Sequence, residues 1–350
     1  MKNKLRKNRI PFALLMAILV LSLFLVMLWA LFSGSVLLSP LQAAKGILFL
    51  LGRGGDEIAA AVLFSIRLPR LLLAMIVGAS LGITGACFQG LFRNSLADPY
   101  IIGASSGAAL GAALAVSIGG LPPLGFFSVF GLPGIFAFIG SLGAVLLAFF
   151  ISRVQGNVPS PLTLILAGTS VSAFCSALLA LILVMKDRSL VQVYYWLLGS
   201  LSGTTWFRLV SVLPFIVIGN IVIFLSSRPL DILLQGEEAA QSLGLNPYRM
   251  RFILAVAATF PIAAVVSVSG VIGFVGLIAP HASRFFTGPT HRRLLPTSAL
   301  TGALLTLIAD TLSRTLIPPM ELPIGVICSL GGAPFFLILL VRYKSKGVFL

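Results

Sequence analysis

The chain is organised as a series of long apolar stretches separated by short polar connections. A transmembrane helix needs about 20 apolar residues to cross the hydrocarbon core of a bilayer. The pattern therefore predicts an all-α integral membrane protein with about ten transmembrane helices, of which the eighth is short. The predicted spans are residues 10–32, 68–91, 100–119, 133–152, 162–185, 208–226, 252–270, 271–287, 297–317 and 324–342.

Glycine recurs at helical spacing in the second and third of these stretches. The second contains Gly78, Gly82 and Gly85, and the third contains Gly107 and Gly111. Rows of small residues let membrane helices approach closely, because no hydrophobic force acts between helices in lipid. We expect tight helix packing at these positions rather than contact with a substrate.

No water-soluble domain separates the apolar stretches. We therefore expect a single transmembrane domain over residues 1–350, with its spans inside 10–342 and its longest polar stretch at 227–251. Composition agrees, because charged residues make up 9% of the chain and the mean hydropathy is +1.10. Soluble domains carry roughly 25% charged residues. A soluble protein is thereby excluded.

The net charge of +15 is distributed between the apolar runs. Nucleic-acid binding would require the basic residues to gather on one face or arm, so a nucleic-acid partner is not expected. If the N-terminus lies in the cytoplasm, 16 of the 24 Lys and Arg residues fall in inside segments and 8 in outside segments. Basic residues favour the cytoplasmic side, which places both termini inside.

Two segments bear on this topology. The apolar run after the basic residues 2–9 is too long for a signal peptide and predicts a retained first span. Without the short eighth span, the basic C-terminal tail would lie outside the cell. This is the reason for keeping 271–287 as a span.

The sequence contains little catalytic or metal-binding chemistry. It has no phosphate-binding loop of the GxxxxGK[ST] type, and its two histidines, His281 and His291, are too few for a metal site. Cys87, Cys175 and Cys328 lie in apolar stretches without metal-ligand spacing, which is typical of buried hydrophobic residues. No enzyme is predicted.

One acidic residue, Asp310, lies clearly inside a span. An intramembrane carboxylate is a candidate functional group. Arg314 follows four residues later on the same helix face, so a neutralised structural pair is favoured over a proton relay. A carrier driven by an ion gradient would need paired intramembrane ionisable groups or broken helices in inverted repeats. The sequence shows one buried Asp and no clear inverted repeat, so transport driven by a partner is favoured, with the carrier as the alternative class.

Four stretches together carry a family resemblance. They are RLPR at 67–70 with GLFRNSLADP at 90–99; GEEAAQSLGL at 236–245; GVIGFVGLIAPH at 270–281; and AD at 309–310 with ELPIG at 321–325 and GGAP at 331–334. In this order the sequence resembles the FecCD family of permeases, the membrane subunits of binding-protein-dependent ABC importers for iron–siderophores, haem and cobalamin.

The resemblance implies an assembly and a cargo. The assembly has two permease subunits, identical or different, two cytoplasmic ATPases and an external substrate-binding protein, in a bacterial or archaeal cytoplasmic membrane. ATP and Mg²⁺ would bind to the partner ATPases, and this chain would bind no cofactor or metal. The implied cargo is an iron–siderophore chelate, with cobalamin, haem or an oxyanion as alternatives.

The resemblance also implies residue roles. Exposed arginines that receive carboxylates of the binding protein would be Arg67, Arg70 and Arg314. The coupling loop to the ATPase, within 227–251, would use Gly236, Glu237, Glu238, Ala240, Leu243 and Gly244. The cytoplasmic gate would use Asn94, Leu96, Ser160, Pro161 and Leu162, although Ser95 stands where the family commonly has proline. The path would be lined by the fifth and tenth spans, through Leu164, Gly168, Ser172, Ile327, Leu330 and Gly331.

Overall fold

The computed structural model describes residues 11–34, 38–118, 131–153, 160–185 and 190–344, and this part of the chain is helical, without a β-strand. Some residues used for the topology prediction lie outside the described part, namely 2–9, Lys186, Arg188 and Lys346, as does Pro159.

Each predicted span corresponds to a helix. The helices are α1 (Phe12–Phe32), α4 (Leu68–Leu91), α5 (Ala104–Ile118), α6 (Gly131–Ile151), α7 (Pro161–Met185), α9 (Trp206–Leu225), α12 (Pro247–Ser269), α13 (Val275–Thr287), α14 (His291–Thr315) and α15 (Ile324–Lys344). Within the described residues, seven helical segments are long and apolar enough to cross a membrane by themselves; α5, α13 and α15 are not among them. The prediction of an all-helical membrane protein is confirmed.

Shorter helices connect the spans. At one end lie α2 (Pro40–Leu50), α3 (Glu57–Ala61) and the π-helix η1 (Val62–Arg67), which continues into α4. Ser39 and Gln42 form a capping box at the start of α2, and Asp56 caps α3. The connection between α7 and α9 contains α8 (Leu190–Leu197), and the predicted polar stretch contains α10 (Ser227–Leu234) and α11 (Glu237–Ser242).

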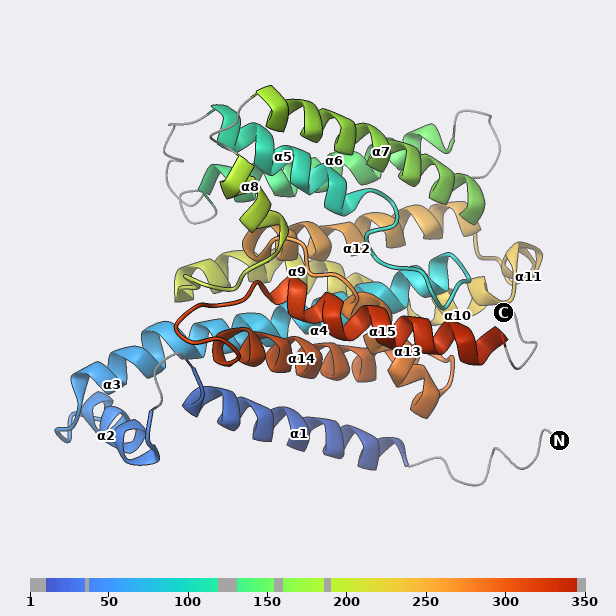
Figure 1. The fold of residues 1–350 in the computed structure, drawn as a ribbon. Coiled ribbons are helices and arrows are strands. Elements are labelled where there is room, and N and C mark those ends of the chain that lie inside the picture. The colour runs from blue at the N-terminus through green and yellow to red at the C-terminus, as the bar shows by residue number, and fades with distance from the viewer. Residues whose placement is uncertain (1–10, 35–37, 119–130, 154–159, 186–189, 345–350) are drawn as a thin grey trace.

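The two ends of the bundle can be told apart in Figure 1. Helices α10 and α11 lie at one end, which we name the α11 end, and α2 and α3 lie at the other, which we name the α2 end. Helix α1 begins and α15 ends at the α11 end. The prediction that both termini lie on the same side is thus confirmed for the described helices.

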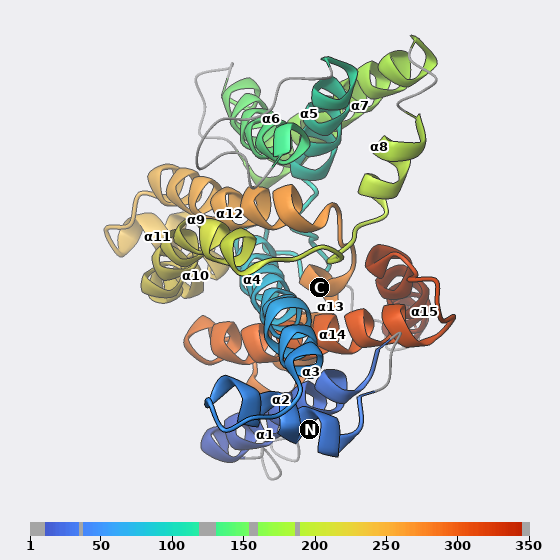
Figure 2. The ribbon, with the colours of Figure 1, turned by 90° about the vertical axis from the view of Figure 1, so that its left-hand side faces the viewer.

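Helix α4 forms the centre of the bundle. Figure 2 shows it between α14 on one side and α9 and α12 on the other, with α5, α6 and α7 forming an outer layer. It is the most deeply enclosed span together with α12, whereas α1 and α7 expose most of their side chains, as helices facing lipid or a second chain do. Cys87 of α4 is fully buried and free of disulfides, as expected from its apolar context.

The glycine rows pack as predicted. A Cβ atom added at Gly78 would collide with the carbonyl oxygen of Gly302 on α14, and one at Gly85 would collide with that of Gly276 on α13. Gly107 of α5 meets the backbone of Gly140 on α6 in the same way. Backbones that approach this closely gain dispersion contacts and Cα–H···O contacts that larger residues would prevent.

The eighth predicted span differs from a full crossing. Helix α12 ends at Gly270, which has φ +66°, and α13 begins only after Phe274, which has φ +65°. The 13 residues of α13 rise about 20 Å, less than the roughly 30 Å of hydrocarbon. The first four residues of the predicted span 271–287 are thus not helical, and the helix of this span is short, as predicted.

Irregular backbone inside a membrane protein must find hydrogen-bond partners within the protein. The break is adjacent to a second irregular segment before α9, where Ser200 N–H donates to the carbonyl of Ser269 at 2.8 Å. The carbonyls of Leu198 and Gly199 accept from Gly325 N–H at 3.1 Å and Ile324 N–H at 3.2 Å, at the start of α15. The irregular segment before α9 thus forms backbone hydrogen bonds with the end of α12 and the start of α15.

Candidate functional site

An ion-pair network links α4, α14 and the connection to α15 at the α2 end. Arg70 Nε lies 2.9 Å from Asp310 Oδ1, and Arg70 Nη1 lies 3.0 Å from both carboxylate oxygens of Glu321. Arg314 Nε lies 3.1 Å from Asp310 Oδ2. Asp310 therefore bridges two arginines, and the predicted pairing of Asp310 with Arg314 is confirmed.

The same network stabilises the end of α1. Arg67 donates to the carbonyl of Leu31, and Arg314 Nη1 donates to the carbonyl of Ser33 at 3.1 Å. The last carbonyls of a helix have no partner in the helix and carry partial negative charge. Arginines from two other helices supply that partner here.

The arginines are buried, which corrects one expectation. Arg67, Arg70 and Arg314 are 5%, 8% and 4% exposed, although the family resemblance implied exposed side chains. Sequence could not show this for Arg67 and Arg70, because the α1 carbonyls and Asp310 that they contact are far away in the chain. Their role in docking a binding protein stays a prediction. Glu321, with one-third of its side chain exposed, is the accessible member of the network.

A cavity of about 760 Å³ opens beside this network. It is lined by α8 and by the connection into α15, including Tyr194, Tyr195, Met320 and Glu321. The two tyrosine rings meet edge to face with centroids 6.4 Å apart, and both side chains are more than 60% exposed. Aromatic faces next to one carboxylate form an amphipathic vestibule at the α2 end.

The predicted coupling loop folds as a short helix held to the bundle. Helix α11 begins at Glu237 after Gly236, which has φ +117°, and Gly244 with φ +76° follows its end. Glu237 Oε1 lies 2.7 Å from Nη1 of Arg251, a buried residue of α12. The prediction of acidic residues at the helix start and glycine near its end is confirmed.

The residues assigned to the coupling loop differ in exposure. Glu238, Leu243 and Gly244 are exposed, and Leu243 is 67% exposed. Ala240 is fully buried, so it packs against this chain rather than presenting a surface to another one. Contact of these exposed residues with an ATPase stays a prediction.

A second link at the α11 end was missed by sequence reasoning. Asp231 of α10 accepts from the backbone N–H of His291 at 2.8 Å and lies 2.7 Å from His291 Nδ1. His291 is fully buried at the first position of α14, close to Gly90 of α4, where an added Cβ would lie 2.6 Å from the imidazole Nε2. No signal in the sequence joined the two residues, because His291 precedes the predicted span 297–317 and Asp231 lies 60 residues earlier.

The first predicted gate segment, the connection between α4 and α5, is held by turns. Asn94 Oδ1 accepts from Leu96 N–H at 2.9 Å, and Asp98 Oδ1 accepts from Tyr100 N–H at 2.8 Å. Burial raises the pKa of Asp98 to about 6, while the hydrogen bond from Tyr100 opposes the shift. The Asp98 carboxyl is thus poised to change its charge near neutral pH.

The second predicted gate segment starts α7. The Ser160 hydroxyl accepts from Thr163 N–H at 3.1 Å, and Pro161 occupies the first helical position, where no N–H is needed. Leu162 is 65% exposed. Both gate segments lie at the α11 end (Figure 1). A gate at this end stays a prediction.

The predicted path lining is corrected on α7. Leu164 is buried, and Gly168 packs against Ile102, so this face contacts the start of α5 inside the chain. The opposite face of α7 is exposed, and it is rich in small and hydroxyl residues: Leu162, Thr163, Leu166, Thr169, Ser170, Ala173, Phe174, Ser176, Ala177 and Ala180. On α15, Leu330 and Gly331 are exposed as expected, whereas Ile327 is half-buried.

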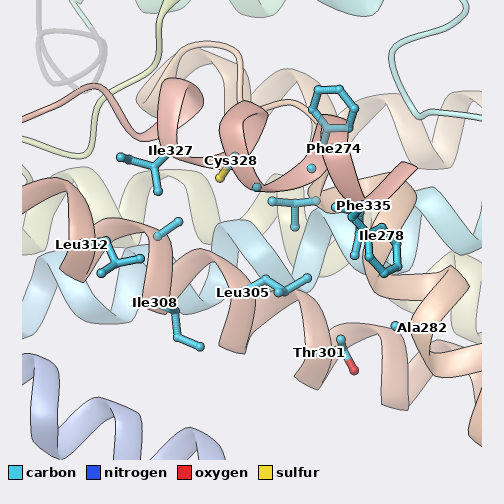
Figure 3. Close-up of a pocket in the computed structure, with 14 residues that line it drawn as sticks. Phe274, Ile278, Ala282, Thr301, Leu305, Ile308, Leu312, Ile327, Cys328 and Phe335 are labelled. Carbon is cyan, nitrogen blue, oxygen red and sulfur yellow. The ribbon is translucent and has the colours of Figure 1, made fainter. Parts of the chain in front are cut away.

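An apolar cavity of about 420 Å³ lies between α13, α14 and α15. Figure 3 shows Ile308 and Leu312 of α14 opposite Ile327 and Cys328 of α15, with Phe335 toward the other end. Its lining contains one hydroxyl group, that of Thr301, which is hydrogen-bonded to Ser283 at 3.1 Å. Such a lining offers no ligands to a metal chelate, so this cavity is not the candidate cargo site.

Comparison with known proteins identifies related chains. The model of the FecCD transport family matches residues 18–342. The cobalamin import system permease protein BtuC of Halobacterium salinarum is 42% identical over 82% of this chain and 75% of its own length. The iron(3+)-hydroxamate import system permease protein FhuG of Bacillus subtilis is 37% identical over 98% of this chain and 99% of its own length.

A solved structure agrees with these sequence matches. A putative metal-chelate type ABC transporter in an inward-facing conformation matches with a TM-score of 0.79 and 32% identity, over 93% of this chain and 98% of that chain.

Proposed function

Because this chain belongs to the FecCD transport family, we propose that it is the permease subunit of an ABC importer for a metal chelate. The observation that supports this function best is α11, an exposed helix fixed to the bundle by the ion pair between Glu237 and Arg251. A rigid protruding helix can receive a push from an ATPase and pass it to α12 as a rigid-body movement.

The proposal includes an orientation and partners. The α11 end faces the cytoplasm and the α2 end faces outward, in the cytoplasmic membrane of a bacterium or archaeon. A second permease subunit, two ATPases and an external binding protein complete the assembly. ATP and Mg²⁺ bind to the ATPases, and this chain acts as a gated conduit that requires no cofactor of its own.

The proposed cargo is an iron–siderophore chelate. The relatives include an iron(3+)-hydroxamate permease and a cobalamin permease at comparable identity, so cobalamin and haem remain the alternative cargoes. Binding measurements on the cognate binding protein with ferric hydroxamate, ferric citrate, haem and cobalamin distinguish them. Selectivity belongs to that protein, because the exposed faces of α7 and α15 offer hydroxyl and apolar groups rather than charges.

A carrier driven by an ion gradient is the second candidate. The structure contains one feature that sequence reasoning did not find and that such carriers use, the buried ion pair of Arg70 and Asp310. Uptake by the purified chain alone under a proton or sodium gradient would favour this candidate.

Changing Glu237 to glutamine tests the coupling role of α11. The change leaves Arg251 without its carboxylate, so α11 loses its fixed orientation, and binding must then supply the free energy of ordering it. We expect about tenfold weaker association with the ATPase. Co-purification of the ATPase with the chain, followed by ATP-dependent uptake in proteoliposomes, measures the effect.

Glu57→Gln is the matched control, because it removes the same charge from an exposed position at the α2 end, away from α11. Loss of an exposed charge changes association only modestly. If Glu237→Gln bound the ATPase as tightly as the unchanged chain, α11 would not be the coupling element.

We propose that Glu321 keeps its ion pair with Arg70 only until a binding protein docks. Its carboxylate is one-third exposed and bonded to Arg70 at 3.0 Å, so a carboxylate from the binding protein can replace it. Glu321→Gln should therefore raise the affinity for the binding protein several-fold, with a steeper dependence on salt. Surface plasmon resonance at two salt concentrations measures this change.

Glu57→Gln provides the comparison for this experiment. Glu57 is exposed at the start of α3, also at the α2 end, and its change alters the net charge equally. An equal rise in affinity for both variants would mean that Arg70 is not the docking group.

A further inference from the structure

A cleft of about 410 Å³ lies at the α11 end, where α9 ends and α10 and α14 begin. It is lined by Phe224 and Leu225 of α9, Ser227 and Arg228 of α10 and Arg292 of α14. The two arginines come from segments more than 60 residues apart in the chain, so only the fold brings them to one cleft. Two guanidinium groups around one cleft provide a binding site for an anion.

Both arginines keep their positive charge available. Arg228 and Arg292 are exposed, and neither forms an ion pair with a carboxylate in the described part of the chain. The acidic residue of α10 is Asp231, whose Oδ1 already accepts from His291. The neighbouring Arg293 lies over the ring of Phe12 at 5.7 Å and so faces α1. The cleft therefore carries more positive than negative charge.

The cleft continues into an apolar helix face. Ile218, Ile221 and Leu225 are 61%, 51% and 78% exposed. Their spacing of three and four residues places them on one side of α9. The opposite side of α9 is buried, and the helix packs against α12. In a membrane protein, an exposed apolar helix face outside the bundle contacts acyl chains.

We propose that this cleft binds the phosphate of an anionic phospholipid, whose acyl chains lie along the exposed face of α9. The arginines donate to the phosphate oxygens, and Ser227 supplies a hydroxyl beside them. Basic pockets between helices at the cytoplasmic side of membrane proteins recognise such headgroups. An apolar face that leads directly into the cleft favours a lipid over a soluble phosphate.

The test compares lipid retention by the full chain and its variants in nanodiscs. Native mass spectrometry measures the ratio of bound phosphatidylglycerol to bound phosphatidylcholine. The R228Q/R292Q double variant should lower this ratio about thirtyfold, and R228K/R292K should largely preserve it. The control R93Q/R249Q removes two exposed charges at the same end, outside the cleft, and should leave the ratio unchanged.

Two further measurements distinguish binding of the lipid from binding of other anions. Leu225→Ser should weaken phosphatidylglycerol binding, and millimolar inorganic phosphate should fail to displace the lipid. Displacement by inorganic phosphate would overturn the proposal in favour of a soluble-phosphate site. Unchanged lipid retention by R228Q/R292Q, with loss of a co-purified ATPase, would overturn it in favour of a protein contact. Monodisperse elution of each variant shows that it is folded.

Discussion

Replacing Asp310 by leucine is expected to destabilise the chain by about 3–5 kcal/mol. Asp310 is fully buried and pairs with both Arg70 and Arg314, at 2.9 and 3.1 Å. Without it, the buried guanidinium group of Arg314 loses its carboxylate partner, and Arg70 keeps only the partly exposed Glu321. The cost arises from the charges left behind, and it exceeds what the added apolar contacts of leucine return.

Thermal unfolding in a mild detergent, followed by the loss of monodisperse protein, measures this cost. The control is Glu321→Gln, which removes an acid from the same network at a partly exposed position and should cost less than about 1 kcal/mol. The double variant D310L/R314L should be more stable than D310L alone, because one of the unpaired charges is gone. Equal stability of D310L and E321Q would show that the network does not hold the α2 end together.

A valine at Gly85 is expected to separate α4 from α13. An added Cβ would collide with the carbonyl oxygen of Gly276, and backbone atoms cannot rotate away as a flexible side chain can. Overpacking of a close helix contact costs roughly 1–3 kcal/mol or more. We expect the upper end of this range or beyond, and a loss of transport, because α13 begins at the helix break and depends on this contact for its position.

Gly143→Val is the control for this change. Gly143 is exposed on α6, and an added Cβ there would have no neighbour within 4 Å. Valine at this position should change the melting temperature by little, since only the small difference in helix propensity remains. If both valine variants melted like the unchanged chain, close packing at Gly85 would not contribute to stability.

The ion-pair network and the His291 link share two helices. Arg70 and Gly90 lie near opposite ends of α4, and Asp310 and His291 lie on α14, which packs along α4. Gly78 and Gly302 keep the two helices in backbone contact between these sites. Closely packed elements move as units rather than deform continuously, so a displacement of α14 at the α11 end reaches the α2 end.

The sequence left an ion-driven carrier as the alternative class, and the buried ion pair of Arg70 and Asp310 adds to the features that such a carrier would need. The composition of the spans showed one carboxylate, Asp310, and its neighbour Arg314. Arg70, at the start of the predicted span 68–91, was placed among the exposed arginines by the family resemblance, and its partner Asp310 lies 240 residues later. The boundary between the predicted spans 252–270 and 271–287 marked the position of the break, but not the non-helical backbone of residues 271–274. Glycine is common in membrane helices, and only the backbone angles at Gly270 and Phe274 distinguish a break from a helix.

The sequence by itself determined the helical spans, the shared side of the termini and the short helix α11. These features depend on local information: apolar length, the side on which basic residues collect, and a glycine–glutamate helix start at 236–237. The glycine rows also indicated close packing, because small residues allow it wherever a neighbouring helix is present.

Only the tertiary structure decided which side chains meet. It buried Arg67, Arg70 and Arg314, turned the predicted path residue Leu164 inward, and joined Asp231 to His291. Each of these outcomes depends on partners far away in the chain, and a period of 3.6 residues defines the faces of a helix without naming the neighbour of each face. Whether a segment forms a helix depends on its own residues, whereas the environment of a charged side chain depends on how the whole bundle is assembled.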